Sequence, residues 1–358
     1  MAELGGTAHL SGYAIEDLRS RLLAWYDSNR RDLPWRRTQD PYAIWVSEIM
    51  LQQTRVAAVV DRYEVFLRNF PSVEALAFAA EDDVLTLWSG LGYYRRARML
   101  HKAAKAVARD HLGVMPRTAA GLRELPGIGA YTSAAIASIA YGEMTAVVDG
   151  NVERVAQRLA GWGSESREGQ SKLSRATETL ANMLLDLKRP GDFNQSMMEL
   201  GATVCLPTSP KCLTCPIELH CRTRGEHPTP KRAKMRSQDA AYALVIRSRG
   251  EDREVLLDQR PEDQTVMPGM WELPALRETE VAASDLNMVV RHAIMEVNYS
   301  VRIRNVAEEE AGELVIPSER RRWTRIHDVD AMPLTGLARK VLFRAKLPEL
   351  SPSITVLK

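Results

Sequence analysis

The stretch Leu125-Pro-Gly-Ile-Gly-Ala-Tyr-Thr132 constrains the fold more than any other part of this chain. The residues before it, from Thr118, have the pattern of a short helix with a threonine N-cap. Gly127 and Gly129 permit backbone angles that other residues avoid, so we expect this helix to end there and a second helix to follow. Unpaired backbone N–H groups at the start of the second helix can bind a phosphate without reading any base. A surface hairpin with no ligand is the alternative.

Asp149 follows the apolar run Ala146-Val-Val148 and precedes a helical pattern that begins near Val152. Aspartate is a preferred N-cap residue, and capping alone explains its presence. The positive end of a helix dipole also favours the ionised carboxylate. A fixed negative charge stabilises the oxocarbenium-like centre that forms when a glycosidic bond breaks. Asp149 is therefore a candidate for both roles.

Glu48 lies in a predicted helix, Ala43 to Thr54, whose residues are apolar on nearly every side. Such a helix is buried, and burial raises the pKa of a carboxyl group. A carboxyl group that stays protonated near neutral pH can act as a general acid. The alternative is a glutamate at the helix edge that faces solvent or an arginine. With Asp149, Glu48 supplies the pair of one neutral and one ionised carboxyl group that glycoside cleavage uses.

All four cysteines lie in one short segment, with six, two and five residues between successive ones. Four thiolates can bind a tetrahedral zinc ion or an iron–sulfur cluster. Zinc ribbons usually have two close pairs of cysteines, whereas this segment has one. The spacing therefore favours a cluster, with Cys205, Cys212, Cys215 and Cys221 as ligands. Four unrelated thiols are the less favoured alternative.

The 358 residues are 45% hydrophobic and 26% charged, which predicts a folded chain of two domains. Because the net charge is only +2, affinity for nucleic acid must come from local basic patches. Basic residues gather in the segments Tyr93–Arg109 and Arg222–Arg236. Solvated faces are the alternative, but beside the glycine hairpin we favour phosphate contact. Since no leader and no membrane span are visible, we expect a soluble, cytoplasmic protein without membrane contact.

Residues 14–200 show helical periodicity interrupted by prolines and glycines. The basic, proline-containing segment that follows the last cysteine reads as an exposed linker. Short apolar or alternating runs then predict the strands Ala240–Ile246, Glu254–Asp258, Val289–Ala293 and Tyr299–Val306. The predicted fold is multi-domain: an all-α domain at 13–221, a linker at 222–238 and a smaller α/β domain at 239–358.

These motifs occur together in one known family. The chain resembles the MutY-type adenine DNA glycosylases of the helix-hairpin-helix, endonuclease-III-like superfamily. The match follows the family order from residue 14 to residue 221. It is carried by Arg31-Asp-Leu-Pro-Trp-Arg36, Trp45-Val-Ser-Glu-Ile-Met-Leu-Gln-Gln-Thr-Arg55, Gly90-Leu-Gly-Tyr-Tyr94, the hairpin, Val148-Asp-Gly-Asn-Val152 and the four cysteines. A weaker match to the family's Nudix-like domain rests on Gln259-Arg-Pro261 and Gly269-Met-Trp-Glu-Leu-Pro274.

The resemblance implies a helix-hairpin-helix glycosylase domain with a [4Fe–4S] cluster loop, and a Nudix-like domain that recognises the lesion. A monomer would remove adenine mispaired with 8-oxoguanine or guanine from double-stranded DNA, after flipping the adenine out of the duplex. In a bacterium such a protein would associate with the nucleoid. Glu48 matches the acid that protonates adenine N7, Asp149 the carboxylate that stabilises the oxocarbenium, and Tyr131 the tyrosine beside it. Further contacts are implied for Trp35, Arg36 and Leu51 at the adenine pocket, for Gln53, Thr54 and Tyr93 at the duplex or opposite base, and for Gly127, Gly129 and Asn151.

Position 131 separates two types of reaction. Relatives that cut the DNA backbone have a lysine there, whose amine forms a Schiff base. A phenol cannot form that intermediate, so Tyr131 predicts a monofunctional enzyme that leaves an abasic site. Thymine–guanine mismatch glycosylases, which can share the tyrosine and the aspartate, are the alternative. They generally lack the sequence motif found here at Met50–Thr54 and the second domain. A non-catalytic iron–sulfur DNA-binding protein is a third possibility, against which the intact Glu48 and Asp149 argue.

The C-terminal domain departs from the family at the loop that reads 8-oxoguanine. The family has Phe-Ser-His there, whereas alignment on Arg291-His-Ala293 places Ile294, Met295 and Glu296 at these positions. The serine and histidine are absent, and a negative charge at Glu296 is unfavourable near DNA. We expect either that another loop reads the lesion or that the preference for it is weak or altered. Residues 269–285 also lack the glutamate-rich helix that a Nudix hydrolase needs to bind magnesium.

Overall fold

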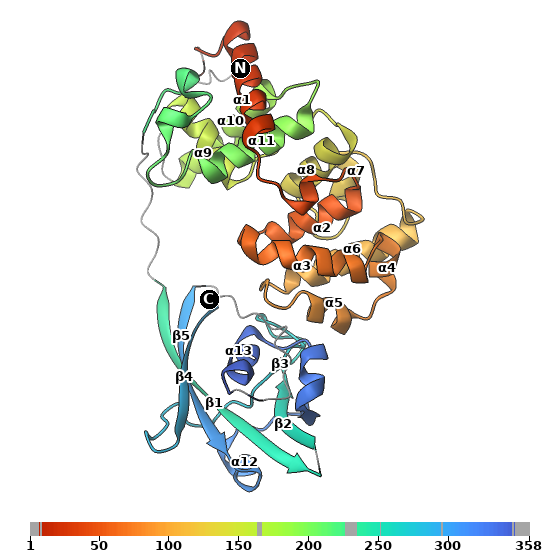
Figure 1. The fold of residues 1–358 in the computed structure, drawn as a ribbon, viewed down its shortest axis with the longest axis vertical. Helices are drawn as coiled ribbons and strands as arrows, with labels where there is room; N and C mark the ends of the chain where they lie inside the picture. The colour runs from red at the N-terminus through yellow and green to blue at the C-terminus, as the bar shows by residue number, and fades with distance from the viewer. Residues whose placement is uncertain are drawn as a thin grey trace. The chain divides into compact units, whose positions relative to one another are not determined.

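A computed structural model describes residues 7, 9–162, 167–225, 235–250, 252–294, 296–345 and 347 (Figure 1). The chain divides into two compact units that interleave along the sequence. The first unit comprises residues 1–53, 71–77 and 102–232, and the second comprises residues 54–70, 78–101 and 233–358. In the part of the chain that the structure describes, no helix is both long and apolar enough to cross a membrane.

The first unit is helical. Its elements are α1 (Gly12–Asn29), the 3₁₀ turn η1 (Pro34–Arg36), α2 (Pro41–Leu51), α4 (Val73–Phe78), the later turns of α6 (Arg95–Asp110), α7 (Ala119–Arg123), α8 (Ala130–Tyr141), α9 (Gly150–Ala160), α10 (Arg167–Leu184), α11 (Pro190–Thr203), and the 3₁₀ turns η2 (Cys212–Thr214) and η3 (Glu218–His220). Every residue of α2 from Tyr42 to Met50 is buried, as its apolar sequence predicts. Helices α1, α9, α10 and α11 share a core that includes Leu22, Leu180 and Phe193.

Helix α11 contacts α1, α8 and α9 and fixes the segment that leads to Asp149. The side-chain oxygen of Asn194 accepts a hydrogen bond from the backbone N–H of Val147 at 3.0 Å. The amide nitrogen of Asn194 donates to Ser138 Oγ and to the Thr145 carbonyl, each at 2.9 Å. Three partners thus satisfy a buried amide that would otherwise be costly to desolvate.

The second unit combines helices with a sheet. Its helices are α3 (Val56–Asn69), α5 (Glu81–Leu87), the first turns of α6 (Arg95–Asp110), α12 (Glu308–Leu314) and α13 (Gly336–Arg344), with the 3₁₀ segment η4 (Ile326–Ala331). Its strands are β1 (Arg236–Arg249), β2 (Asp252–Gln259), β3 (Trp271–Glu272), β4 (Leu286–Ile294), β5 (Val297–Val306) and β6 (Arg321–Arg325). The strand order is β3-β2-β1-β5-β4, and β6 also pairs with β2. Only the pair β1–β5 is parallel among these described strand pairs.

The sheet has a separate apolar core on each face. Leu244 and Val290 belong to the core that includes Val341 of α13. Ala243 and Val245 belong to the core that includes Ala311 of α12. The two helices therefore cover opposite faces, as expected from the alternation of side chains along a strand. Figure 1 shows both helices in blue.

The helical segments of the second unit are tied to the loops of the sheet by hydrogen bonds to backbone carbonyls. The buried Tyr94 donates its O–H to the Leu334 carbonyl at 3.3 Å. Arg98 Nη2 donates to the Pro268 carbonyl at 2.7 Å. Thr86 Oγ1 donates to the Ala331 carbonyl at 3.1 Å. Residues 78–101 are thus part of the same compact unit as the sheet.

The predicted helices and strands are confirmed to within a few residues, but the linker is shorter than its sequence predicts. Strand β1 begins at Arg236, where it pairs with Val297, so the polar start of this strand was wrongly assigned to the linker. The basic residues Lys231, Arg232 and Lys234 lie outside the described residues. The domains predicted at 13–221 and 239–358 stay a prediction. The compact units divide the chain differently, because α3 and α5 group with the sheet.

Candidate active site

Glu48 and Tyr131 meet inside the first unit, although 83 residues separate them in the sequence. The Tyr131 hydroxyl donates a hydrogen bond to Glu48 Oε2 at 2.5 Å. Glu48 is on α2 and is 6% exposed, while Tyr131 is in the first turn of α8, which packs against α2. Burial raises the pKa of Glu48 to about 7, against the opposing effects of the Tyr131 hydrogen bond and the Arg36 charge. The carboxyl group is therefore available in its protonated form near neutral pH.

Tyr131 remains a phenol in this environment. Burial raises its pKa well above the ordinary value, and the neighbouring Glu48 and Asp149 act in the same direction. Its hydroxyl also lies 3.5 Å from Met198 Sδ on α11. A neutral phenol held between α2 and α11 can orient the carboxyl group of Glu48, but it cannot act as an amine nucleophile.

Asp149 caps α9, as its position in the sequence predicts. Its Oδ1 accepts hydrogen bonds from the backbone N–H groups of Asn151 and Val152, at 2.9 and 2.7 Å. Its Oδ2 accepts one from Asn151 Nδ2 at 2.9 Å. Three donors at the start of α9 therefore fix the orientation of this carboxylate.

The contacts of Asn151 continue toward the cysteine segment through Arg154. Arg154 Nη2 donates to Asn151 Oδ1 at 2.9 Å and to the Gly201 carbonyl at 2.7 Å. Arg154 Nε donates to the Cys205 carbonyl at 2.8 Å. One half-buried guanidinium thus connects the cap of α9 with the end of α11 and the first cysteine.

A buried ion-pair cluster lies next to these groups, and sequence reasoning missed its acidic member. Glu199, 1% exposed on α11, accepts hydrogen bonds from Arg31 Nη2 at 2.6 Å and from Arg36 Nη2 at 2.7 Å. Although burial favours the protonated form, the bonds from Arg31 and Arg36 lower the pKa of Glu199 to about 2. The only signal in the sequence was a glutamate close to the apolar residues Met197 and Leu200 of a predicted helix.

The residues predicted to line the adenine pocket lie on η1 and α2. Trp35 is buried in η1, Arg36 follows it, and Leu51 is the half-buried last residue of α2. Gln53 comes two residues later and is exposed, with a φ of 54° in the left-handed region. A non-glycine residue in that region is strained, and such strain is concentrated at functional sites. The roles of these residues stay predictions.

Tyr93 and Thr54 belong to the second unit, where Arg96 holds them. Tyr93 is 46% exposed and also has a positive φ, 47°. Arg96 Nη2 donates to Thr54 Oγ1 and to the Leu91 carbonyl at 2.9 Å, and to the Gly92 carbonyl at 3.1 Å. Burial lowers the pKa of Arg96 to about 10. The loop that carries Tyr93 is thus fixed by one buried guanidinium, which leaves the tyrosine ring partly exposed.

The glycine hairpin joins α7 to α8. Thr118 caps α7 by accepting a hydrogen bond from the Gly121 N–H at 3.2 Å, as predicted. Gly127 has a φ of +78°, which requires glycine. For Gly129 the expectation was wrong, because its φ of −90° and ψ of −176° are extended angles that any residue adopts. Gly129 is the N-cap of α8 and provides no side-chain cap, so the first N–H groups of α8 remain available to an anion.

The four cysteines are all free and half-buried. Cys205, Cys215 and Cys221 pack against the core shared by α1, α9, α10 and α11. The buried Arg158 donates from Nη1 to Cys205 Sγ at 3.3 Å. Among the described residues, no three potential ligands are close enough to hold a single metal ion. Four thiols without a histidine or carboxylate fit the ligand set of an iron–sulfur cluster.

The loop that departs from the family connects β4 to β5. Ile294 is the last residue of β4, Glu296 is exposed in the turn, and Met295 is outside the described residues. The Glu296 carbonyl accepts a hydrogen bond from the Arg236 N–H at 3.0 Å, which joins this turn to the start of β1. The role of this turn in reading the opposite base stays a prediction.

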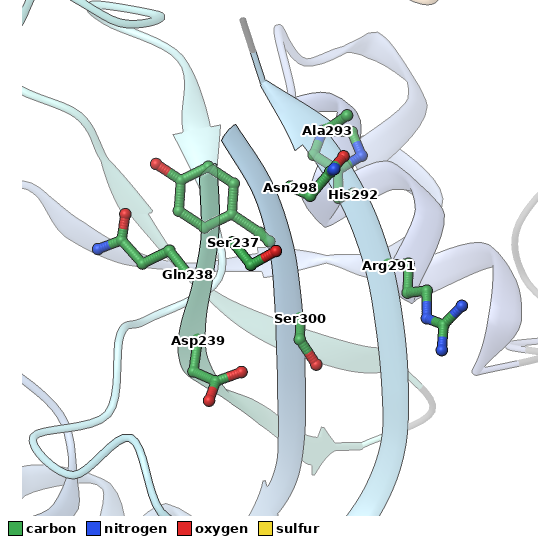
Figure 2. A pocket seen from close by; sticks show the side chains of 9 residues that line it. Ser237, Gln238, Asp239, Arg291, His292, Ala293, Asn298 and Ser300 are labelled. Atoms are coloured by element: carbon green, nitrogen blue, oxygen red, sulfur yellow. The ribbon is translucent and has the colours of Figure 1, made fainter. Parts of the chain in front are cut away.

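A polar hollow of about 600 Å³ lies beside this turn, across β1, β4 and β5. It is lined by Ser237, Gln238, Asp239, Arg291, His292, Ala293, Asn298, Tyr299 and Ser300. In Figure 2 the side chains of Gln238 and Arg291 extend away from each other on opposite sides of the hollow. The lining groups therefore do not converge on one bound molecule, and we assign no ligand to this hollow.

Comparisons with known proteins agree with this fold. The model of the HhH-GPD superfamily of base excision DNA repair proteins matches residues 46–182. A thermostable thymine-DNA glycosylase superposes with a TM-score of 0.54 and 30% identity, over 60% of this chain and 98% of that one. An endonuclease III trapped as a covalent intermediate with DNA superposes with a TM-score of 0.51, over 60% of this chain and 97% of that one. Because the two sequences are only 21% identical, this similarity shows a shared fold and nothing more.

Helices joined by a glycine hairpin, with a buried acid between them, define the class of protein. The chain belongs to the HhH-GPD superfamily of base excision DNA repair proteins. Its curated relatives include the adenine DNA glycosylase of Homo sapiens, 49% identical over 219 residues, which are 59% of this chain and 40% of that protein. The adenine DNA glycosylase of Arabidopsis thaliana is 35% identical over 348 residues, covering 84% of this chain and 55% of that protein. This chain thus spans about half the length of these relatives.

Proposed function

We propose that this chain is a monofunctional adenine DNA glycosylase, which removes adenine mispaired with 8-oxoguanine or guanine in duplex DNA and leaves an abasic site. The observation that carries the proposal is the buried hydrogen bond from Tyr131 to Glu48. Burial raises the pKa of this Glu48 carboxyl group to about 7. The names of the curated relatives support adenine as the base.

The proposed reaction uses the two carboxyl groups in different protonation states. Protonated Glu48 donates its proton to N7 of the flipped adenine, so that the electrons of the breaking C1′–N9 bond pass to the base. The Asp149 carboxylate, fixed by its bonds to the start of α9, stabilises the positive charge that develops on the sugar. Water then adds to C1′ and releases a proton, which restores the acid. Tyr131 holds Glu48 and forms no covalent bond with the sugar.

We also propose that Cys205, Cys212, Cys215 and Cys221 hold a [4Fe–4S] cluster. When bound, the cluster would fix the conformation of the cysteine segment against the helical core and take no part in base removal. The contacts of Arg154 and Arg158 with this segment, at the Cys205 carbonyl and Cys205 Sγ, support a structural role next to α9.

The DNA contacts in this proposal come from both units of a monomer. The uncapped start of α8 would bind a backbone phosphate, and the strained, exposed Gln53 and Tyr93 would contact the duplex or the opposite base. The sheet of the second unit would act as a Nudix-like recognition module. Because the sequence of its β4–β5 turn has Met295 and Glu296 in place of the family's serine and histidine, the module would distinguish 8-oxoguanine from guanine only weakly.

A single-turnover glycosylase assay tests the proposal, with adenine placed opposite 8-oxoguanine, guanine or cytosine, and thymine opposite guanine. We expect adenine to be removed opposite the first two bases, without strand cleavage. Glu48→Gln should lower the rate on the order of 100- to 10,000-fold, because it removes the proton donor while DNA binding persists. Near-normal excision by this variant, or excision of thymine in preference to adenine, overturns the assignment.

The same assay tests lesion recognition. We expect similar rates opposite 8-oxoguanine and guanine, because the turn at Glu296 lacks hydrogen-bond donors suited to the lesion. A strong preference for 8-oxoguanine that disappears in Tyr93→Ala or Gln53→Ala would instead assign lesion recognition to these two residues.

A further inference from the structure

We infer that Glu199 is a positioning residue for the proposed excision: it holds Arg36 in place and neutralises its charge, so that Glu48 keeps the proton that it donates. The inference rests on the proposed function, because it concerns the proton donor of that reaction. Glu199 would not touch the substrate. It would act through Arg36, which lies on η1 among the residues expected to line the adenine pocket.

The geometry leaves Arg36 little freedom. Its Nη2 donates to Glu199 Oε2 at 2.7 Å, and its Nη1 donates to the Arg31 carbonyl at 3.1 Å. Its guanidinium carbon lies 5.5 Å from the centre of the Tyr26 ring, in a cation–π contact. The Arg36 side chain is 10% exposed. Glu199 is itself held by Arg31, through Nε at 2.8 Å, Nη2 at 2.6 Å and the backbone N–H at 3.1 Å.

The charged and titratable groups that face Glu48 come from three elements. They are Tyr131 on α8, Asp149 at the start of α9, and Arg36 on η1. Of these, Asp149 raises the pKa of Glu48, whereas the Tyr131 hydrogen bond and Arg36 lower it. Arg36 is the positive charge among these groups, and Glu199 is its ion-pair partner. With both side chains buried, solvent screens their charges poorly, so removing Glu199 would expose Glu48 to the full positive charge of Arg36.

A purely structural role is the competing explanation for Glu199. Breaking a buried ion pair destabilises a protein whatever its function, because one charge remains buried without a partner. Such a role predicts a loss of thermal stability with no change in the protonation of Glu48. The pH at which excision is lost separates the two explanations.

The experiment measures the single-turnover rate of adenine excision against pH, with the complete protein and a duplex that holds adenine opposite guanine. The wild-type rate should fall as pH rises through about 7, where Glu48 loses its proton. Glu199→Gln should move this midpoint down on the order of one pH unit, so the rate above the midpoint falls roughly tenfold. Glu199→Asp, which keeps the charge, should retain the wild-type midpoint.

Two further variants complete the test. Arg36→Gln removes the positive charge and should move the midpoint up, and the double variant Glu199→Gln/Arg36→Gln should return it toward the wild-type value. Asp192→Asn is the matched control, because Asp192 is a carboxylate on the same helix that pairs with Arg189 away from Glu48. It should leave the midpoint unchanged.

An unchanged midpoint in Glu199→Gln, with only the melting temperature lowered, overturns the inference. If Glu199→Gln does not fold, Arg36→Gln decides alone, and a midpoint that stays or falls in this variant also overturns the inference. Failure of the wild-type protein to excise adenine from any duplex counts instead against the proposed function.

Discussion

Glu48 is placed where its charge is poorly tolerated. It lies among Ile44, Trp45 and Ile49, with 6% of its surface exposed, and ionisation there loses hydration that the one hydrogen bond from Tyr131 replaces only in part. A stable fold alone would favour a neutral residue at this position. The reaction that we propose needs a carboxyl group that holds a proton near neutral pH and can release it, so the site accepts a loss of stability at high pH.

The stability of the protein should therefore fall as pH rises through the neutral range. Glu48 has a pKa of about 7 when folded and an ordinary value of 4.5 when unfolded. Between these values the folded state binds the additional proton, so the free energy of unfolding decreases with pH and levels off above the folded pKa. This group contributes a loss of about 3 kcal/mol across that range. This loss of stability is complete above pH 7 and absent below the unfolded pKa of Glu48.

Thermal unfolding of the wild-type protein and Glu48→Gln between pH 5 and pH 8 measures this effect, since glutamine cannot ionise. From pH 5 to pH 8, the melting temperature of Glu48→Gln should rise by several degrees relative to that of the wild-type protein. A constant difference between the two melting temperatures would mean that Glu48 is not buried as a neutral acid.

The sequence predicted the surroundings of some site residues but not of others. Glu48 and Asp149 were predictable because the residues next to them in the chain create their surroundings: an apolar helix in one case and a helix start in the other. Glu199 was not, because its partner Arg31 is 168 residues away and no local pattern connects them. The hydrogen bond from Tyr131 to Glu48 was likewise invisible to periodicity, and the family resemblance placed Tyr131 beside Asp149 and not beside Glu48.

At the scale of elements, α11 organises the site. It carries Glu199 toward Arg36, Met198 toward Tyr131 and Asn194 toward the segment before Asp149. It also passes so close to α9 that a Cβ on Gly201 would lie 2.5 Å from Asn151 Cβ and 3.0 Å from its Cα. Only a glycine allows this approach without displacing α9.

Gly201→Ala should accordingly damage both stability and excision. Alanine favours a helix over glycine by about 1 kcal/mol, but overpacking against Asn151 costs roughly 1–3 kcal/mol, so the clash outweighs the gain. Displacement of the start of α9 would move Asp149 away from the sugar, and a shift on the order of 1 Å can lower the rate about 100-fold. Melting temperature and single-turnover rate measure the two effects.

Gly312→Ala on α12 is the matched control, because among the described residues no atom outside its own stretch of helix lies within 4 Å of the Cβ that it adds. It should keep or raise the melting temperature and leave excision unchanged. If Gly201→Ala behaves like this control, α11 does not position α9 as we describe.

Helices were easier to predict than the start of the sheet, for a physical reason. A helix satisfies its backbone within one segment, so apolar spacing reveals it, as it did for α1 to α6. Strand β1 begins with Arg236-Ser-Gln-Asp239, all exposed and polar, and is a strand only because β5 pairs with it in parallel. That pairing depends on a segment about 60 residues away, as the partners Arg236 and Val297 show, and leaves no local signal.

At the scale of the whole molecule, the compact units do not follow the order of the chain. Residues 54–70 and 78–101 lie in the helical part of the sequence but group with the sheet. The amino-acid composition could not reveal this grouping, because these helical segments and the sheet are joined only by tertiary contacts. The consequence is that Tyr93, a proposed DNA contact, belongs to the same compact unit as the proposed recognition module.

Arg98 is a main link within this second unit. Its Nη2 donates to the Pro268 carbonyl at 2.7 Å, and its Nε donates to Glu81 Oε1 at 2.7 Å. Arg98→Ala removes both bonds and leaves the carbonyl without this donor. Since a hydrogen bond to a charged group contributes roughly 1.5–3 kcal/mol, we expect local opening to become about tenfold or more frequent.

Hydrogen exchange in the full chain measures that opening. In Arg98→Ala, residues 78–101 and the loop around Pro268 should exchange faster together, whereas α9 in the first unit should keep its wild-type protection. Arg95→Ala, on the same helix but exposed, is the control and should change neither region. Faster exchange at residues 78–101 alone would mean that this helical segment is stable without the sheet, and the second unit would then be two bodies in contact. If both regions exchange faster together, any movement of the proposed recognition module also moves Tyr93. The proposed recognition of the opposite base and the proposed contact of Tyr93 with the duplex would then be coupled.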